Sequence, residues 1–281
     1  MKRFLFFAVM ALVCVNASAQ LTAEEYKAKY ERQVRNVGYD GVGVETILDN
    51  WEAVAPDDPD MLLGRFNYYL FKSQSTEMVP MARSKYLGKA PALTLKDEAG
   101  NPVNYFEDTL YDDACFGEAL KVIDELIRQH PYELNFHFIK AANLMSYEKE
   151  DPYLAYMEIG DLISMHSSRK PAWQYLGEAV SADIFAEFVQ QYCAAFFEVG
   201  SEASYEYFKE LSVRMSKLFP KHTGFIDNQG SYYLVCQRNF KKAISFYDKA
   251  LKIDPEDQVA LRNKKIAQRQ IDIEKKNGKK K

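Results

Sequence analysis

The sequence is poor in the residues that build turn-rich or cross-linked proteins. Its 281 residues include only 13 glycines, 10 prolines and 4 cysteines. Few glycines and prolines argue against an all-β protein, which needs a turn after every short strand. Only three of the cysteines follow residue 19, and an odd number over so long a chain provides no framework of disulfides. Because 47% of the residues are hydrophobic, the chain can still bury a large core, and we predict a mainly helical fold.

The sequence also lacks the common catalytic and metal-binding motifs. The four histidines form no H-E-x-x-H pattern, and G-x-S-x-G, GxxxxGK[ST] and GxGxxG do not occur. Acidic pairs such as Asp58/Asp60 are as typical of helix caps and loops as of acid–base catalysis. We therefore predict that the protein is not an enzyme, with no catalytic residues, no metal site and no cofactor.

No domain of the chain has the strong positive charge that nucleic-acid binding requires. The sequence contains 36 basic and 40 acidic residues, a formal net charge of −4. Its one basic cluster is the C-terminal segment 275–281, which is typical of a flexible, solvated tail. We predict no nucleic-acid partner.

The first residues have the pattern of a secretory signal peptide. Lys2 and Arg3 precede an apolar run at 4–15, and Ala17-Ser18-Ala19 follows as a cleavage site. The run is shorter than the roughly 20 residues that span a bilayer, although retention as a membrane anchor is the alternative. Cys14 lacks the small preceding residues typical of lipidation. We expect cleavage of 1–19, export to the periplasm or the medium, and no integral membrane segment afterwards.

One spacing recurs along the chain. A small or apolar residue is followed four and seven positions later by residues on the same helical face. A proline follows five positions after the last of these three residues. The segments 243–255, 119–131 and 44–56 show this pattern, and 208–220 keeps the interval with less suitable residues. The shared face predicts a helix packed on a partner, and the proline predicts the end of that helix.

This spacing resembles the second helix of the tetratricopeptide repeat (TPR), whose signature continues W-x2-L-G-x2-Y with A-x3-F and P. The stretch WQYLGEAV at 173–180 matches the first-helix half, with Val180 where tyrosine is usual. The resemblance covers most of 20–274 and is strongest at 225–255. It implies an all-α, right-handed superhelix that binds a peptide or protein along the concave face lined by first helices.

On this basis we predict about five helix pairs and a C-terminal capping helix at about 257–274. The pairs are 22–36 with 42–55, 60–73 with 113–129, 134–147 with 152–166, 172–199 with 202–219, and 225–237 with 240–253. The second pair contains an insertion at 78–110. There Leu93, Leu95, Val103 and Tyr105 alternate around a Gly-Asn turn, which predicts a β-hairpin that packs on neighbouring helices.

A polar stripe on the predicted first helices is the candidate ligand face. Its residues are Arg65, Tyr68, Lys72, His137, Lys140, Gln174, Glu178, Asn228 and Tyr232. The basic members suit a free carboxylate or an acidic segment of a peptide. We expect Tyr232 to carry little core packing, although ordinary solvated surface is the other interpretation of such a stripe.

Together these features favour a non-catalytic scaffold of the bacterial cell envelope that binds a protein or peptide partner. One alternative is a carbohydrate-binding or hydrolytic envelope protein, with Tyr105 and Phe106 of the insertion as aromatic platforms. Another is a structural subunit of outer-membrane assembly machinery. Exposed aromatic residues in the groove would favour a peptide, and exposed aromatic residues around the hairpin would favour a sugar. The oligomeric state stays open.

Overall fold

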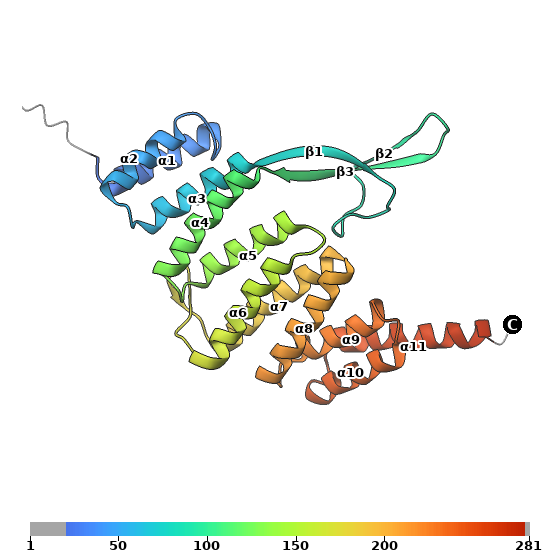
Figure 1. Cartoon of the computed structure of the whole chain (residues 1–281). Helices are drawn as coiled ribbons and strands as arrows, with labels where there is room; N and C mark the ends of the chain where they lie inside the picture. The colour runs from blue at the N-terminus through green and yellow to red at the C-terminus, as the bar shows by residue number, and fades with distance from the viewer. Residues whose placement is uncertain (1–20, 279–281) are drawn as a thin grey trace, which may run out of the picture.

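The computed structural model describes residues 21–278, which form eleven helices and five strands (Figure 1). The helices are α1 (Ala23–Val37), α2 (Val44–Val54), α3 (Pro59–Ser73), α4 (Asp113–Gln129), α5 (Leu134–Glu148), α6 (Tyr153–Arg169), α7 (Ala182–Val199), α8 (Glu202–Leu218), α9 (Thr223–Val235), α10 (Phe240–Ile253) and α11 (Gln258–Gly278). The strands are β1 (Gln74–Met81), β2 (Leu93–Lys96), β3 (Pro102–Tyr111), β4 (Gln174–Tyr175) and β5 (Glu178–Ala179). The predicted signal peptide and residues 279–281 of the predicted tail lie outside the described residues. No helix within 21–278 is both long and apolar enough to cross a membrane.

The helices pack in pairs, as the recurring spacing predicts. α1 packs on α2, α3 on α4, α5 on α6, α7 on α8 and α9 on α10, and each pair also touches the next (Figure 1). The predicted and observed bounds of α4 agree because Asp112 caps the helix by accepting from the backbone N–H of Cys115 at 2.8 Å. α11 packs on α10 in the place of the predicted capping helix, and it continues beyond residue 274 into the segment predicted as tail.

The stretch WQYLGEAV is not a helix, which corrects the interpretation of 173–180 as the first half of a repeat. It forms the hairpin of β4 and β5, and α7 begins only after Ser181. Leu176 (φ 52°) and Gly177 (φ 79°) close the hairpin in the left-handed region, as a two-residue turn requires. Their backbone N–H groups donate to the carboxylate of Glu133, which stabilises this turn from a distant part of the chain.

The insertion contains the predicted hairpin and one strand more. β2 and β3 pair antiparallel, with Leu93 opposite Tyr105 and Leu95 opposite Val103. β1, a strand that no pattern in the sequence predicts, pairs with the other edge of β3 and gives the sheet order β1-β3-β2. β1 follows α3 directly, and the sheet extends away from the helices in Figure 1.

The loop 82–92 attaches this sheet to the helices. Tyr86 packs edge-on against buried Phe106 and donates its hydroxyl hydrogen to Asp108 (3.2 Å), which also pairs with Lys149 beyond the end of α5 (2.7 Å). At Gly88 (φ 76°) an added Cβ would lie 2.4 Å from the carbonyl oxygen of Glu198, so only glycine fits against the end of α7. The insertion is therefore attached to the helices through this loop and through Asp108, whereas β2 is exposed along its whole length, so the expectation that the hairpin itself packs on helices is only partly met.

Small residues set the distance between paired helices. Ala243 and Ala250 of α10 are fully buried, and Gly230 of α9 faces the ring of Tyr247. A Cβ at Gly230 would lie 2.5 Å from Cε1 of Tyr247, closer than two carbon atoms can approach. The buried ring cannot move aside without disturbing the pair.

We expect Gly230→Ala to destabilise the protein by about 1–3 kcal/mol because the new methyl group overpacks the α9–α10 contact. Gly117→Ala is the matched control, since a Cβ at this helical position meets no atom within 4 Å. That variant should be more stable than the parent by about 0.5–1 kcal/mol. Urea unfolding followed by circular dichroism measures both changes, and shifts of the same sign would contradict this account.

Candidate functional site

The nine residues of the predicted polar stripe do not form one open surface. Gln174 and Glu178 lie on β4 and β5 and not on a first helix, which corrects their predicted placement. Most of the others are buried, namely Arg65, Tyr68, His137, Asn228 and Tyr232. Only 4% of Tyr232 is exposed, so the expectation that it carries little core packing is wrong.

The three stripe residues of α3 form hydrogen bonds and ion pairs within the protein. The Arg65 guanidinium donates to Asp49 and Glu52 of α2, each at 2.8 Å. The ammonium group of Lys72 donates to the hydroxyl of Tyr68 at 3.1 Å. The charge of Arg65 is thus neutralised within the protein, and it joins the first helix pair to the second.

The two stripe residues of α5 meet at Glu158 of α6. His137 Nδ1 lies 2.7 Å from one carboxylate oxygen, and Lys140 Nζ lies 2.8 Å from the other. Lys140 also pairs with Asp124 of α4 at 2.9 Å. Burial opposes ionisation of Glu158, but the hydrogen bonds from His137 and Lys140 outweigh it, so the pKa of this carboxyl lies below its ordinary value.

The stripe residues of α9 form hydrogen bonds to α7 and α8 of the fourth pair. The side-chain amides of Asn228 and Gln190 exchange two hydrogen bonds of 2.9 and 3.0 Å, and Asn228 also donates to Ser212 at 3.0 Å. Tyr232 donates its hydroxyl hydrogen to Glu206. The polar stripe therefore consists mainly of joints between successive helices, and its cations do not support the predicted acidic ligand.

A different group of residues forms an accessible surface on α6 and α8. The rings of Tyr156 and Tyr207 stack with centroids 4.5 Å apart, and Tyr153 lies 6.3 and 6.2 Å from them. We call these three residues the tyrosine cluster. The hydroxyl of Tyr156 donates to Glu210 (2.8 Å) and that of Tyr207 to Asp151 (2.7 Å), so the stacked rings are held in one orientation.

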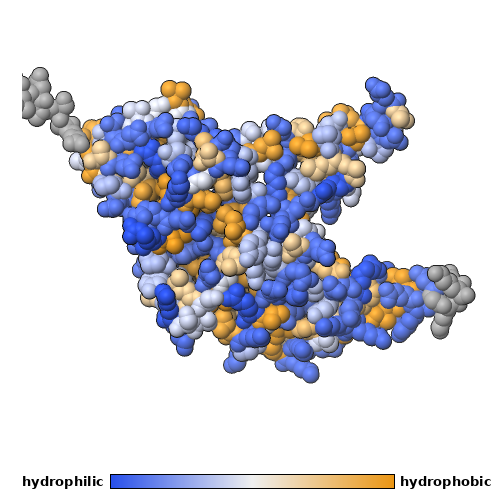
Figure 2. Space-filling view, in the orientation of Figure 1, coloured by the Kyte–Doolittle hydropathy of each residue, from blue (hydrophilic) through white to orange (hydrophobic). Residues whose placement is uncertain are grey.

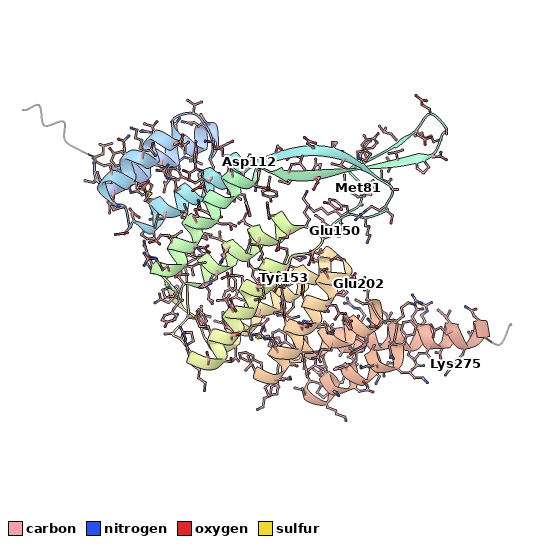
Figure 3. The ribbon with its side chains drawn as sticks, viewed as in Figure 1. Met81, Asp112, Glu150, Tyr153, Glu202 and Lys275 are labelled. Atoms are coloured by element: carbon pink, nitrogen blue, oxygen red, sulfur yellow. The ribbon has the colours of Figure 1, made fainter. Side chains whose placement is uncertain are left out.

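Local structure places the cluster at the start of α6. The carboxylate of Glu148 accepts from the backbone N–H groups of Leu154 and Ala155, which begins the helix at Tyr153. Tyr153 is labelled on α6 in Figure 3. Arg214 of α8 then donates to the carbonyl oxygen of Gly160 at 2.7 Å. Because Gly160 has no side chain, this arginine can cross α6 and hold the two helices together.

Three neighbouring side chains of α6 are exposed beside the stacked rings. Tyr153 is 49% exposed, Leu154 47% and Met157 41%. Residues three and four positions apart lie next to one another on a helix, so these side chains form one patch. Carboxylates border it, including Asp151 and Glu210. The surface is thus apolar and aromatic at its centre and acidic at its edge.

The aromatic residues of the insertion do not form a comparable platform. Phe106 is buried beneath Tyr86, and Tyr105 is partly buried on the opposite face of β3. A sugar-binding protein would expose aromatic residues around the hairpin. Tyr105 and Phe106, which were predicted to provide them, are partly buried and buried.

Within residues 21–278, the possible metal ligands are not clustered, and burial keeps two of the three cysteines as neutral thiols. Among residues 21–278, no group of three or more histidine, cysteine or acidic side chains could hold a metal ion. Burial raises the pKa of the Cys193 thiol and of the Cys236 thiol to about 12, so neither provides a thiolate at neutral pH. An open cleft of about 610 Å³ lies beside Glu150, between the loop 82–92 and the start of α8, and mixes basic, acidic and aromatic side chains.

Comparison with known proteins finds no matching family model and no matching curated protein. Among solved structures, the chain is similar to YrrB, a TPR protein with an unusual peptide-binding site, at 15% identity and a TM-score of 0.39 over 87% of this chain and 92% of that one. It is also similar to yeast Tom70, at 10% identity and a TM-score of 0.38 over 88% of this chain and 39% of that one. The TPR domain of P58(IPK) shares 12% identity and a TM-score of 0.32 over 90% of this chain and 56% of that one.

The chain therefore spans most of the length of YrrB and about half or less of the other two structures. At these identities and TM-scores, nothing about the binding surface of this chain follows from the comparison.

Proposed function

We propose that the protein is a non-catalytic module that binds a protein or peptide partner through the tyrosine cluster and the neighbouring side chains Leu154 and Met157. The observation that carries the proposal is the exposure of Tyr153, Leu154 and Met157 beside a stacked, hydrogen-bonded tyrosine pair. Contiguous exposed apolar surface marks interaction sites, and tyrosine is enriched among the residues that dominate binding energy.

The geometry of the cluster lowers the entropic penalty of binding. Asp151 and Glu210 already fix the hydroxyl groups of Tyr207 and Tyr156, so these rings lose little freedom when a partner covers them. Tyr153 and Met157 can then bury their exposed area against the partner. Met157 has an unbranched, flexible side chain that adapts to differently shaped ligands.

The charges around the cluster indicate the chemistry of the partner. Asp151 and Glu210 carry negative charge at the border, and the guanidinium of the neighbouring Arg214 donates to the carbonyl oxygen of Gly160 and the hydroxyl of Ser164. A segment with apolar side chains flanked by lysine or arginine complements this surface. The partner class that we propose is therefore a basic, partly apolar peptide segment, in place of the acidic one expected from the sequence.

Peptides selected from a displayed random library against the chain 20–281 test the proposal. We expect basic-apolar peptides that bind with micromolar affinity, about −8 kcal/mol, and more weakly as salt is added. Met157→Asp and Tyr153→Ala should each weaken binding about tenfold or more, a loss of roughly 1.4 kcal/mol, without lowering the melting temperature.

Ile184→Asp is the matched control, because Ile184 is similarly exposed on α7 outside the cluster. Its affinity for the selected peptides should equal that of the parent. Peptides whose binding is unchanged by both cluster substitutions would place the ligand elsewhere and overturn the proposed site.

A further inference from the structure

The last helix, α11, has two apolar rows. One row is buried against α10, and the other is exposed. Ala260 and Ala267 are fully buried in the contact with α10. Val259, Ile266 and Ile273 form a second row at seven-residue intervals, and they are 45%, 43% and 43% exposed. We call these three residues the outer row. Residues seven apart lie nearly above one another on a helix, so the outer row is a continuous stripe.

This row is unusual for the end of a helical stack. The helices between α1 and α11 have helical neighbours on both sides along the chain, whereas α11 follows the last pair and packs on α10 and α9 within the described residues. A terminal helix of a stack normally presents a polar outer surface to water. Figure 1 shows α11 projecting beyond α9 and α10, and Figure 2 shows hydrophobic residues among hydrophilic ones on this C-terminal arm.

A row of positive charge runs beside the outer row. Each of its residues is followed three positions later by an exposed basic residue, in the pairs Val259–Arg262, Ile266–Arg269 and Ile273–Lys276. Residues three apart are neighbours on the helix surface, so the cations line one edge of the stripe. Over the whole helix, six basic residues stand against the two acids Asp272 and Glu274. One of the six, Lys264, is paired with Asp248 of α10 at 2.6 Å.

We propose that the outer row of α11 is a docking surface for an amphipathic helix of a partner protein whose apolar row is flanked by aspartate or glutamate. Such a helix would pack its apolar side chains between Val259, Ile266 and Ile273 and pair its carboxylates with Arg262, Arg269 and Lys276. It would add one more helix to the stack in the manner of the pairs already present.

The charge pattern and the width of the stripe argue against two other occupants, a second copy of this chain and a lipid surface. A second copy of α11 would bring one cationic row near another, and like charges at such distances repel. A lipid surface binds helices with a broad apolar face rich in large side chains. The outer row has only one apolar residue per two turns, with Asn263 and Gln270 on its other side, so it is narrower than the apolar face of a membrane-binding helix.

Designed peptides of about three heptads provide the probe. One has leucines at heptad spacing flanked by glutamates, and the other has lysines in place of these glutamates. Fluorescence anisotropy with the chain 20–281 should show binding of the acidic helix, at least about tenfold tighter than the basic helix and weakened by salt. Ile266→Asp and Arg269→Glu should each reduce the affinity for the acidic helix several-fold, with an unchanged melting temperature because both side chains are exposed.

Met157→Asp in the tyrosine cluster should leave the affinity for the acidic helix unchanged, so failure of this proposal and failure of the proposed function can be told apart. Equal binding of the two peptides would overturn the proposal. So would self-association of the parent that Ile266→Asp abolishes, which would assign the row to a second copy. Binding to anionic phosphatidylserine vesicles that Ile266→Asp abolishes, without binding of the acidic peptide, would assign the row to a lipid surface.

Discussion

Glu158→Ala should lower the free energy of unfolding by about 3–5 kcal/mol, because it leaves two cationic or polar partners without their buried carboxylate. The Glu158 side chain is only 13% exposed, and its two oxygens bond to His137 and Lys140 on the facing helix. Removing the carboxylate leaves the buried imidazole of His137 without its hydrogen-bond partner at Nδ1. Chemical denaturation followed by circular dichroism measures the loss.

Asp124→Ala is the matched control for this prediction, because Asp124 pairs with the same Lys140 but has a side chain that is 56% exposed. Water replaces an exposed partner, so this variant should lose less than about 1 kcal/mol. Equal losses in the two variants would show that the bonds of Glu158 to His137 and Lys140 do not hold α6 on α5 as the structure indicates.

The contribution of Glu158 should also depend on pH. Because the folded protein holds the pKa of this carboxyl below its unfolded value of roughly 4.3, its stabilisation is present above that pH. The stabilisation is lost as the pH falls through the lower, folded pKa. The difference in stability between the parent and Glu158→Ala should therefore shrink when both are unfolded in increasingly acidic buffer.

Asp227→Asn should have the opposite effect and stabilise the protein at pH 8 and above. Asp227 lies in α9, is 3% exposed, and has one carboxyl oxygen without a hydrogen-bond partner among the described residues. Burial and the neighbouring charge of Asp257 raise its pKa to about 8. Asp257 itself caps α11 by accepting from the backbone N–H groups of Val259 (2.9 Å) and Ala260 (3.0 Å).

The raised pKa makes the parent less stable as the pH increases. Between about pH 4 and 8 the folded state keeps a proton on Asp227 that the unfolded state has released. The stabilisation that this proton provides is fully present below about pH 4 and is lost as the pH rises towards 8. Each unit of pKa shift corresponds to about 1.4 kcal/mol, so the total loss is on the order of a few kcal/mol.

Unfolding measured at a series of pH values should show this decline in the parent and a flatter profile in Asp227→Asn. Asp161→Asn, at an exposed position of α6, should leave the profile of the parent unchanged. Parallel profiles for the parent and Asp227→Asn would mean that Asp227 is ionised throughout this range.

The helix pairs were predictable because their signals are local. α4 and α10 have the predicted bounds, since capping residues, apolar periodicity and a following proline all act within a few residues of the helix end. The hairpin of β2 and β3 followed in the same way from alternation around a glycine-containing turn. β1 has no such alternation, and it becomes a strand because β3 offers an edge for pairing.

The segment 173–180 shows where local signals mislead. Its tryptophan, leucine and glycine fit the spacing of a helix, and Trp173 is indeed buried, with its indole N–H donating to His166. The hairpin is selected instead by Glu133, which accepts from two backbone N–H groups about forty residues further along the chain. No pattern within eight residues contains that partner.

The candidate site was the least predictable part of the protein. Tyr153, Tyr156 and Met157 have the three- and four-residue spacing of one helical face, and this pattern could have indicated an aromatic surface. The prediction relied on the polar stripe instead. Tyr207, which completes the cluster, comes about fifty residues later. Its position beside α6 follows only from the packing of α6 on α8.

By itself, the sequence determined the order and extent of most helices and the place of the insertion, because hydrophobic periodicity, caps and prolines act over a single turn or two. The signal peptide at 1–19 stays a prediction of the sequence, since it lies outside the described residues. Only the tertiary structure decided which polar side chains are available to a partner. Arg65, His137 and Asn228 look like ligand-binding residues in the sequence, but each meets its partner on a neighbouring helix. A buried polar group requires such a partner, and the identity of that partner depends on how distant helices pack.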